Sequence, residues 1–169
     1  MLGRLIVVLF GVLGAGGLAQ GPEIASQYQQ RLGGAVSELE TVIRQFDADV
    51  ANNGLTRPAA IDVYQKSPEA FLRDRGRSME IALKRYDSLK NQIEGFEGAS
   101  DLYKPVYMIM NADKTVLEGV RKDYTLGLPV TTSGIAYGVI GAFLGAFFGM
   151  FLRMLAGSGK AAVPSRSGR

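Results

Sequence analysis

The sequence predicts an all-α fold in which two transmembrane helices, one at each end of the chain, enclose an extracytoplasmic antiparallel helical bundle. Three observations lead to this prediction. Both ends of the chain contain a long apolar segment without charges. The residues between them carry apolar side chains at the three- and four-residue steps of amphipathic helices. All 16 acidic residues lie in that middle part.

The apolar segment near the C-terminus is free of charged residues over positions 133–151. A bilayer core of about 30 Å is crossed by roughly 20 apolar helical residues. The segment therefore predicts a transmembrane helix over residues 131–156.

The N-terminal segment, residues 1–21, predicts a second transmembrane helix, although its uncharged stretch is shorter. It also has the features of a secretory signal, with Arg4 before an apolar core and small residues at Gly17 and Ala19. We expect this segment to be retained as a span. Cleavage is the alternative, and it would leave the middle domain on the same side of the membrane.

The basic residues outside the middle domain indicate the orientation. The net charge is +3, yet the outer ends of the two apolar segments carry no acidic residue. Basic flanks stay in the cytoplasm according to the positive-inside rule. We therefore expect both termini to be cytoplasmic and the domain of residues 22–130 to be periplasmic, in a bacterial inner membrane. The basic residues of the outer ends are Arg4, Arg153, Lys160, Arg166 and Arg169.

Membrane topology accounts for the basic residues at the outer ends of the two apolar segments. We therefore expect no nucleic-acid binding. Residues 157–169 are rich in Gly, Ser, Pro and basic side chains. This composition predicts a disordered cytoplasmic tail.

The first part of the middle domain predicts one long helix followed by a short one. Pro22 fits a first helical turn, and Gly54 after two asparagines is a stop signal. Thr56 is then the expected N-cap of a short helix that has Pro58 in its first turn and reaches about Lys66.

The second part predicts two further long helices. One starts near Ser67 and ends near Gly98, and the next runs from Ser100 to about Gly127. Pro105 is expected either to kink this last helix or to delay its start. Residues 131–133 are expected to cap the C-terminal span. Three long helices and a short one favour an antiparallel bundle.

Glycines recur along one face of the C-terminal span at small-xxx-small spacing. Glycine lets another helix approach backbone to backbone, so these positions predict a helix-packing surface. The partner is the chain's own first span, which offers Gly11, Gly14 and Ala15, or a second copy, or a foreign subunit. The predicted packing residues are Gly134, Gly138, Gly141, Gly145 and Gly149.

The densest charge cluster of the middle domain is residues 73–78 (RDRGRS), in which Arg73 and Arg77 share a helix face, and Lys84 follows two turns later. These three basic residues are candidates for contact with an anionic lipid headgroup or an acidic partner. The alternative is a solvated surface in which Glu69 pairs with Arg73 and Glu80 pairs with Lys84.

Gly76 lies inside a predicted helix, where close packing of another helix is a reason to retain it. Asp47 and Asp49 diverge by about 200° on a helix and make a poor cation site. A solvated helix end is the preferred interpretation of these two carboxylates.

The composition argues against catalysis. The chain has no Cys, His or Trp, which removes disulfides, thiolate ligands and imidazole bases together. No nucleotide-binding glycine loop, Ser–Lys pair or metal-ligand cluster can be assembled. We therefore expect no enzyme activity, no catalytic or metal site and no cofactor.

Several short motifs, taken together, point to a known family. They are residues 28–35 (YQQRLGGA), 46–49 (FDAD), 54–57 (GLTR), 71–72 (FL) and 75–79 (RGRSM), followed by the apolar segment after Pro129. The set resembles an uncharacterised family of small proteobacterial inner-membrane proteins, known only as a domain of unknown function. The resemblance covers about residues 1–155. It implies two spans with an extracytoplasmic helical domain, and it implies no catalytic residues.

The sequence favours a non-enzymatic inner-membrane interaction protein, either an accessory or assembly subunit of a larger membrane complex or a homo-oligomer. Its expected partners are membrane lipids and other membrane subunits or itself. The alternative is a membrane-anchored module that binds a lipid or another envelope ligand. A transport component is disfavoured because neither apolar segment carries an ionisable residue at mid-depth.

Overall fold

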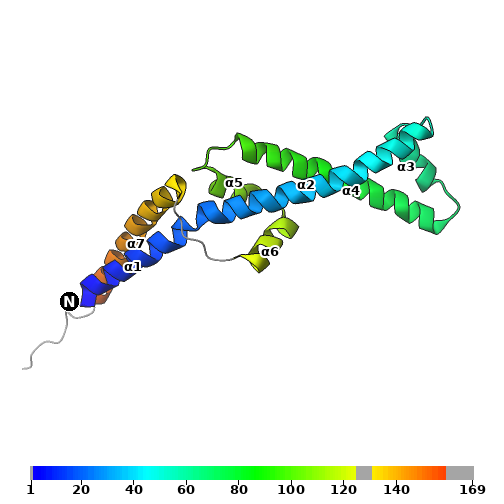
Figure 1. Ribbon diagram of the computed structural model, residues 1–169. Helices are drawn as coiled ribbons and strands as arrows, with labels where there is room; N and C mark the ends of the chain where they lie inside the picture. Colours follow the sequence, from blue (N-terminus) through cyan, green and yellow to red (C-terminus); the bar gives the residue numbers. More distant parts are fainter. Residues whose placement is uncertain (1, 125–130, 159–169) are drawn as a thin grey trace, which may run out of the picture. The chain divides into compact units, whose positions relative to one another are not determined.

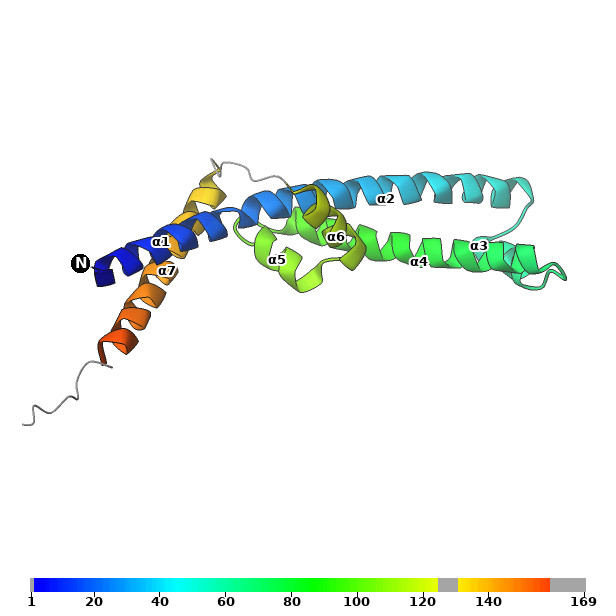
Figure 2. The ribbon, with the colours of Figure 1, turned by 90° about the horizontal axis from the view of Figure 1, so that it is seen from below.

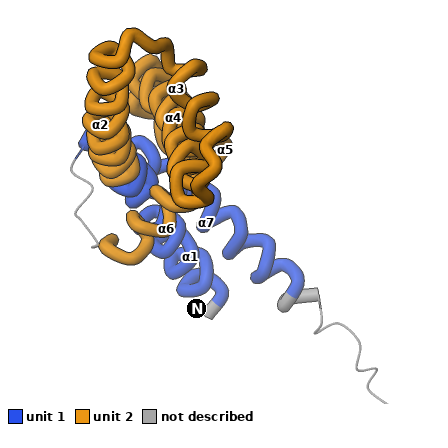
Figure 3. The backbone as a smooth tube through the Cα atoms, turned by 90° about the vertical axis from the view of Figure 1, so that its right-hand side faces the viewer, with its two compact units in different colours: residues 1–25, 125–169 blue, residues 26–124 orange. Residues whose placement is uncertain are grey.

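The computed structural model describes residues 2–124 and 131–158, and over these residues it contains α-helices and no strand (Figure 1). The chain divides into two compact units, coloured separately in Figure 3. Unit 1 is Met1–Ala25 with Thr125–Arg169, and unit 2 is Ser26–Tyr124. The prediction of an all-helical chain is thus confirmed for the described residues.

Unit 1 contains helices α1 (Leu2–Ala19) and α7 (Thr132–Ser158), which lie side by side (Figures 1 and 2). Two helical segments of the described chain are long and apolar enough to cross a membrane, one within Gly3–Asn52 near the N-terminus and one over Thr132–Leu155. The hydroxyl of Thr131 accepts a hydrogen bond from the Gly134 amide at 3.0 Å, so Thr131 caps α7 as predicted.

Helix α2 (Gly21–Asn52) begins with Pro22 in its first turn and ends before Gly54. Gly54 has a φ of +64°, a left-handed conformation that glycine adopts without strain. The Thr56 hydroxyl then accepts a hydrogen bond from the Ala59 amide at 3.4 Å and caps α3 (Arg57–Gln65). The predicted stop and restart between these helices are both confirmed.

Helix α4 (Ala70–Gly98) returns antiparallel to α2 to form a long hairpin (Figure 2). One apolar cluster joins the C-terminal part of α2 to α3 and to the N-terminal part of α4. It consists of the buried side chains Phe46, Val50, Ala60 and Met79. At the other end of the hairpin, the fully buried rings of Tyr28 and Phe96 lie 5.6 Å apart between centroids.

The prediction of one long helix after Ser100 is wrong. The structure has two short helices, α5 (Lys104–Asn111) and α6 (Lys114–Asp123), separated at Ala112 and Asp113. Asp113 has an extended backbone, and its carboxylate accepts a hydrogen bond from the Val116 amide at 3.0 Å. This side-chain cap favours the start of α6 over continuation of α5.

Two further predictions fall on residues that the structure does not describe. The expected helix end at residues 127–129 lies outside the described residues, as does the part of the predicted disordered tail from residue 159 onward. The described part of α6 ends at Asp123.

Candidate helix-packing site

The glycines of α7 bring its backbone into direct contact with α1. A Cβ atom placed on Gly141 would overlap the Gly14 carbonyl oxygen. A Cβ on Gly145 would lie 2.7 Å from the Phe10 carbonyl carbon, and one on Gly149 would lie 2.8 Å from the Val7 Cα. No side chain larger than hydrogen fits these positions unless the two helices separate.

The remaining predicted positions have looser surroundings. A Cβ on Gly138 would lie 3.5 Å from the Ala19 Cβ, an ordinary contact distance. Gly134 is buried in the first turn of α7, where its amide donates to Thr131. Of the three partners considered for the glycine face, the structure therefore places the chain's own α1 against it.

The outer surface of the α1–α7 pair is apolar. Phe143 is 74% exposed and Phe147 is 72% exposed. A groove of about 460 Å³ runs between the helices on one side of the pair. Its walls are aliphatic, small or aromatic side chains, among them Val8, Gly11, Ala15, Val139, Ala142 and Phe143.

The basic residues predicted as a contact site have separate local partners. Arg73 donates to the backbone carbonyls of Ser67 and Pro68 at 2.9 and 2.7 Å, and so closes the loop before α4. Arg77 lies 3.4 Å from Asp74.

Lys84, the third predicted contact residue, lies 2.8 Å from Glu80, which is the pair that the alternative interpretation expects. The hydrogen bond from Lys84 holds the pKa of the Glu80 carboxyl below its ordinary value. The structure gives Arg73 loop carbonyls as partners, in place of the expected pair with Glu69.

Two other single positions can be placed. Gly76 is buried against α3, where an added Cβ would lie 2.6 Å from the Tyr64 Cβ, so the expected close packing is present.

Asp47, expected to be solvated, accepts two hydrogen bonds of 2.5 Å from Arg57. These bonds hold the pKa of the Asp47 carboxyl below its ordinary value. The sequence did not reveal this pair because it depends on the turn between α2 and α3.

A polar network inside unit 2 was also missed by sequence reasoning. The Tyr28 hydroxyl donates to the Gln92 side-chain oxygen at 2.5 Å and accepts from the Asp113 amide at 2.8 Å. Gln92 in turn donates to the Asn111 carbonyl, and Arg85 donates to the Asp113 carboxylate at 3.2 Å. The buried Tyr28 hydroxyl thus links α2 to α4 and to the N-cap of α6. Burial raises the pKa of Tyr28, so this hydroxyl stays protonated.

The network predicts an acid-dependent loss of stability. Burial raises the pKa of the Asp113 carboxyl, but hydrogen bonds from the Val116 amide and Arg85 outweigh it, so the pKa is lowered on balance. A lowered folded-state pKa stabilises the protein above the unfolded-state pKa of about 4, and this contribution is lost as the pH falls through the folded value. We expect Asp113→Asn to lower the free energy of unfolding at neutral pH by about 1 kcal/mol and to flatten the acid dependence.

Urea unfolding of the detergent-solubilised chain between about pH 7 and pH 3 measures this dependence. Asp101→Asn is the matched control, because that carboxylate is 80% exposed and its ion-pair partner Lys104 is a neighbour in sequence. An equal acid dependence in Asp113→Asn and in the unaltered chain would contradict the assignment.

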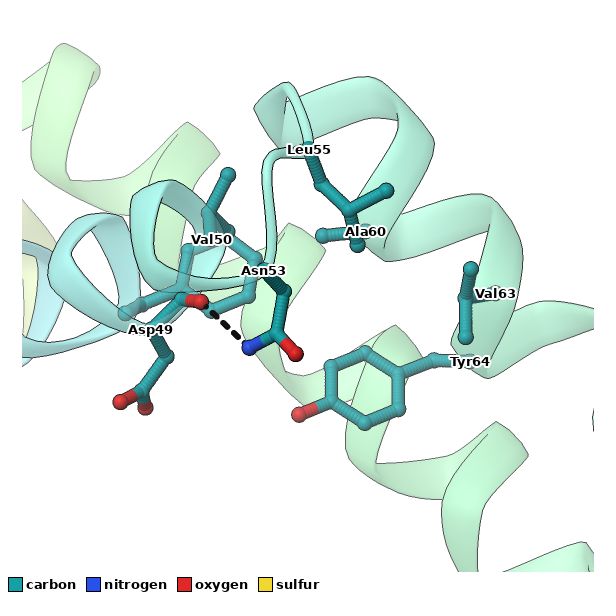
Figure 4. A pocket seen from close by; sticks show the side chains of 8 residues that line it. Asp49, Val50, Asn53, Leu55, Ala60, Val63 and Tyr64 are labelled. Carbon is teal, nitrogen blue, oxygen red and sulfur yellow. Dashed lines mark hydrogen bonds between the residues drawn. The ribbon is translucent and has the colours of Figure 1, made fainter.

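The described surface of unit 2 has a hollow of about 210 Å³ where α2 meets α3 (Figure 4). It is lined by Leu55, Ala60, Val63 and Tyr64, and the Asn53 side chain at its edge donates to the Asp49 carbonyl at 2.8 Å. This volume is below the range of roughly 300–1,000 Å³ typical of small-molecule sites. Within residues 2–124 and 131–158, no group of three or more acidic side chains is placed to hold a metal ion.

The comparisons with known proteins support one part of the predicted resemblance, membership of a family of unknown function. No curated protein and no solved structure matches the chain. A family model described as a protein of unknown function (DUF2937) matches residues 2–161, which is nearly the whole sequence. The chain therefore belongs to the DUF2937 family.

Proposed function

We propose that the protein is an integral membrane protein whose α1 and α7 cross a bacterial inner membrane as a packed pair and whose unit 2 is a periplasmic interaction domain. The observation that carries this proposal is the combination found in unit 1. The two helices contact each other through backbone atoms, while their large apolar side chains point outward.

Lipid explains that combination better than water does. Contiguous exposed apolar surface is rare on soluble monomers, and each Å² removed from water contributes about 25 cal/mol. In a bilayer the same surface is solvated by acyl chains, and small residues drive helix contact by close packing. Both helices satisfy their backbone hydrogen bonds internally, as a span requires.

The charges support one orientation. Arg4 lies near the start of α1, and Arg153 lies near the end of α7. These ends of the two helices are the ones free of acidic residues, which favours a cytoplasmic position for both. Unit 2 follows α1 and precedes α7, so it belongs on the opposite side.

Unit 2 is proposed to bind other proteins and to carry out no reaction itself. Its hairpin presents exposed apolar side chains that do not contribute to its core, including Phe71 at 77% and Ile81 at 60% exposure. Since α1 already occupies the glycine face of α7, further subunits bind elsewhere on the chain. An accessory or assembly subunit and a homo-oligomer are the two forms of this function.

Topology is tested with single cysteines, because the chain has none of its own. We expect a membrane-impermeant maleimide to label Ser88→Cys, on the exposed surface of α4, in intact cells. Ser165→Cys in the basic tail is expected to react only after lysis. The reverse pattern, or release of the protein from membranes by alkaline carbonate, would overturn the proposal.

The partner is tested by purifying the tagged full chain from native membranes in mild detergent, with mass spectrometry of everything retained. A stoichiometric foreign complex supports an accessory subunit. Recovery of the chain as a defined oligomer supports self-assembly. A stoichiometric lipid on a monomer would favour the ligand-binding alternative instead.

A further inference from the structure

The apolar groove between α1 and α7 has the size of a small-molecule site. Its volume of about 460 Å³ falls in the range of roughly 300–1,000 Å³ that such sites have. Along α1 the lining residues run from Val7 to Ala15, which is about 12 Å at the helical rise of 1.5 Å per residue. Both helices contribute small and aliphatic side chains to the lining, so the groove suits a hydrocarbon chain.

Two arginines lie together at one end of this helix pair. The helices run antiparallel, because Gly149 near the end of α7 contacts Val7 near the start of α1. An added Cβ on Gly3 would lie 2.9 Å from both Cδ and Nε of Arg153. The Arg153 side chain therefore reaches across to the first turn of α1, beside Arg4. Both arginines are exposed.

The helical period places these two arginines in line with the groove. Arg4 precedes the groove residue Val8 by four positions and Gly11 by seven. Arg153 follows the groove residue Ala146 by seven positions. Steps of four and seven residues keep side chains on one face of a helix. The apolar groove thus points toward two positive charges at one of its ends.

Unit 1 has no acidic side chain near these charges. Its only acidic residue is Glu23, which lies beyond the opposite end of α1. A second copy of the helix pair would not supply a negative charge either. Copies of a membrane protein share one orientation, so the basic end of the second copy would meet Arg4 and Arg153. The complementary molecule is therefore apolar along the groove and anionic at one end.

We propose that unit 1 binds one anionic phospholipid, with an acyl chain in the groove and the phosphate group at Arg4 and Arg153. This inference rests on the membrane anchoring proposed above, and it is independent of the protein that unit 2 binds. A guanidinium group donates paired, charge-assisted hydrogen bonds to phosphate oxygens. The two arginines belong to the end of unit 1 proposed to be cytoplasmic, and anionic lipids give the cytoplasmic leaflet its negative surface potential.

Native mass spectrometry of the full chain in mild detergent tests the headgroup contact. The chain is offered equal amounts of phosphatidylglycerol and phosphatidylcholine with identical acyl chains, and we expect it to retain one phosphatidylglycerol in preference. Arg4→Gln and Arg153→Gln are each expected to lower this preference about fivefold, the effect of one basic side chain near a membrane surface. Arg77→Gln is the matched control, because this exposed arginine lies on α4 of unit 2.

Gly11→Leu tests the acyl-chain contact. An added Cβ on Gly11 would lie 3.6 Å from the Ala142 carbonyl oxygen, an ordinary contact distance, so the helix pair is retained while the larger side chain fills the groove. We expect Gly11→Leu to lower the retained phosphatidylglycerol several-fold. Gly17→Leu makes the same change in volume on α1 where an added Cβ has no neighbour within 4 Å, and it is expected to have no effect.

Three results would overturn the inference. Equal retention of the two lipids would show that the arginines do not select the headgroup. A loss in the arginine variants without a loss in Gly11→Leu would show general attraction of anionic lipid to basic helix ends. Retention that no variant changes would place the lipid elsewhere on the chain.

Extraction of membranes with alkaline carbonate separates this inference from the anchoring on which it rests. Release of the unaltered chain would show that α1 and α7 do not cross the bilayer, and the proposed function would fail. A chain that stays in the membrane but shows any of the three results above would overturn the lipid site alone.

Discussion

Gly145→Leu is expected to separate α1 from α7 and to abolish their packing. Even the first side-chain carbon at this position would lie 2.7 Å from the Phe10 carbonyl carbon and 3.2 Å from the Gly11 Cα. Backbone atoms cannot rotate away as side chains do, so the helices must move apart along their whole contact. Overpacking of this kind costs roughly 3 kcal/mol, and here it also removes the neighbouring contacts of Gly141 and Gly149.

A disulfide reports this separation directly. A Cβ at Gly11 would lie 3.8 Å from the Ala146 Cβ, within the range of about 3.5 to 4.5 Å that a disulfide requires. The double variant Gly11→Cys, Ala146→Cys is therefore expected to close under mild oxidation in membranes. Protection of both thiols from a polyethylene-glycol maleimide measures closure, and addition of Gly145→Leu is expected to leave both thiols reactive.

Gly16→Leu is the matched control, because a Cβ at Gly16 has no neighbour within 4 Å. The same change in volume, placed on the open side of α1, is expected to leave the disulfide intact. A disulfide that forms between two chains rather than within one would contradict the packing of α1 on α7. Closure that persists in Gly145→Leu would show that the two helices are not in backbone contact.

The parts of the fold that were predictable from sequence depend on local signals. The stop at Gly54, the cap at Thr56 and the cap of α7 at Thr131 follow from the conformational preferences of single residues. The glycine face of α7 was predictable for the same reason, because spacing along one helix determines which residues share a side. Its partner was not predictable, since α1, a second copy and a foreign helix satisfy the same spacing.

The errors arose where tertiary contacts decided between local alternatives. Asn111 through Asp113 can continue a helix or start a new one, and the hydrogen bond from the Asp113 amide to Tyr28 favours the break. That bond joins positions far apart in the chain, so no window of sequence contains both partners. Asp47 and Arg57 are close in sequence, but their pairing depends on the turn at Gly54, which brings the two side chains together.

Phe96→Ala is expected to destabilise unit 2 by about 3 to 5 kcal/mol. The Phe96 ring is fully buried and lies between the rings of Tyr28 and Tyr107, at centroid distances of 5.6 and 5.2 Å. Its removal leaves a cavity where α2, α4 and α5 meet. A domain with a typical stability of about 5 to 15 kcal/mol loses a large part of it in this way. Guanidinium unfolding of the detergent-solubilised chain, followed by circular dichroism, measures the loss.

Phe71→Ala is the matched control for Phe96→Ala. Both phenylalanines lie on α4, but Phe71 is 77% exposed. Alanine has the higher intrinsic helix propensity, so each substitution favours the helix by the same few tenths of a kcal/mol. If the hairpin were stable because of helix propensity, both variants would unfold at or above the denaturant concentration of the unaltered chain. A loss confined to Phe96→Ala would show that burial at the junction with α5 holds unit 2 together.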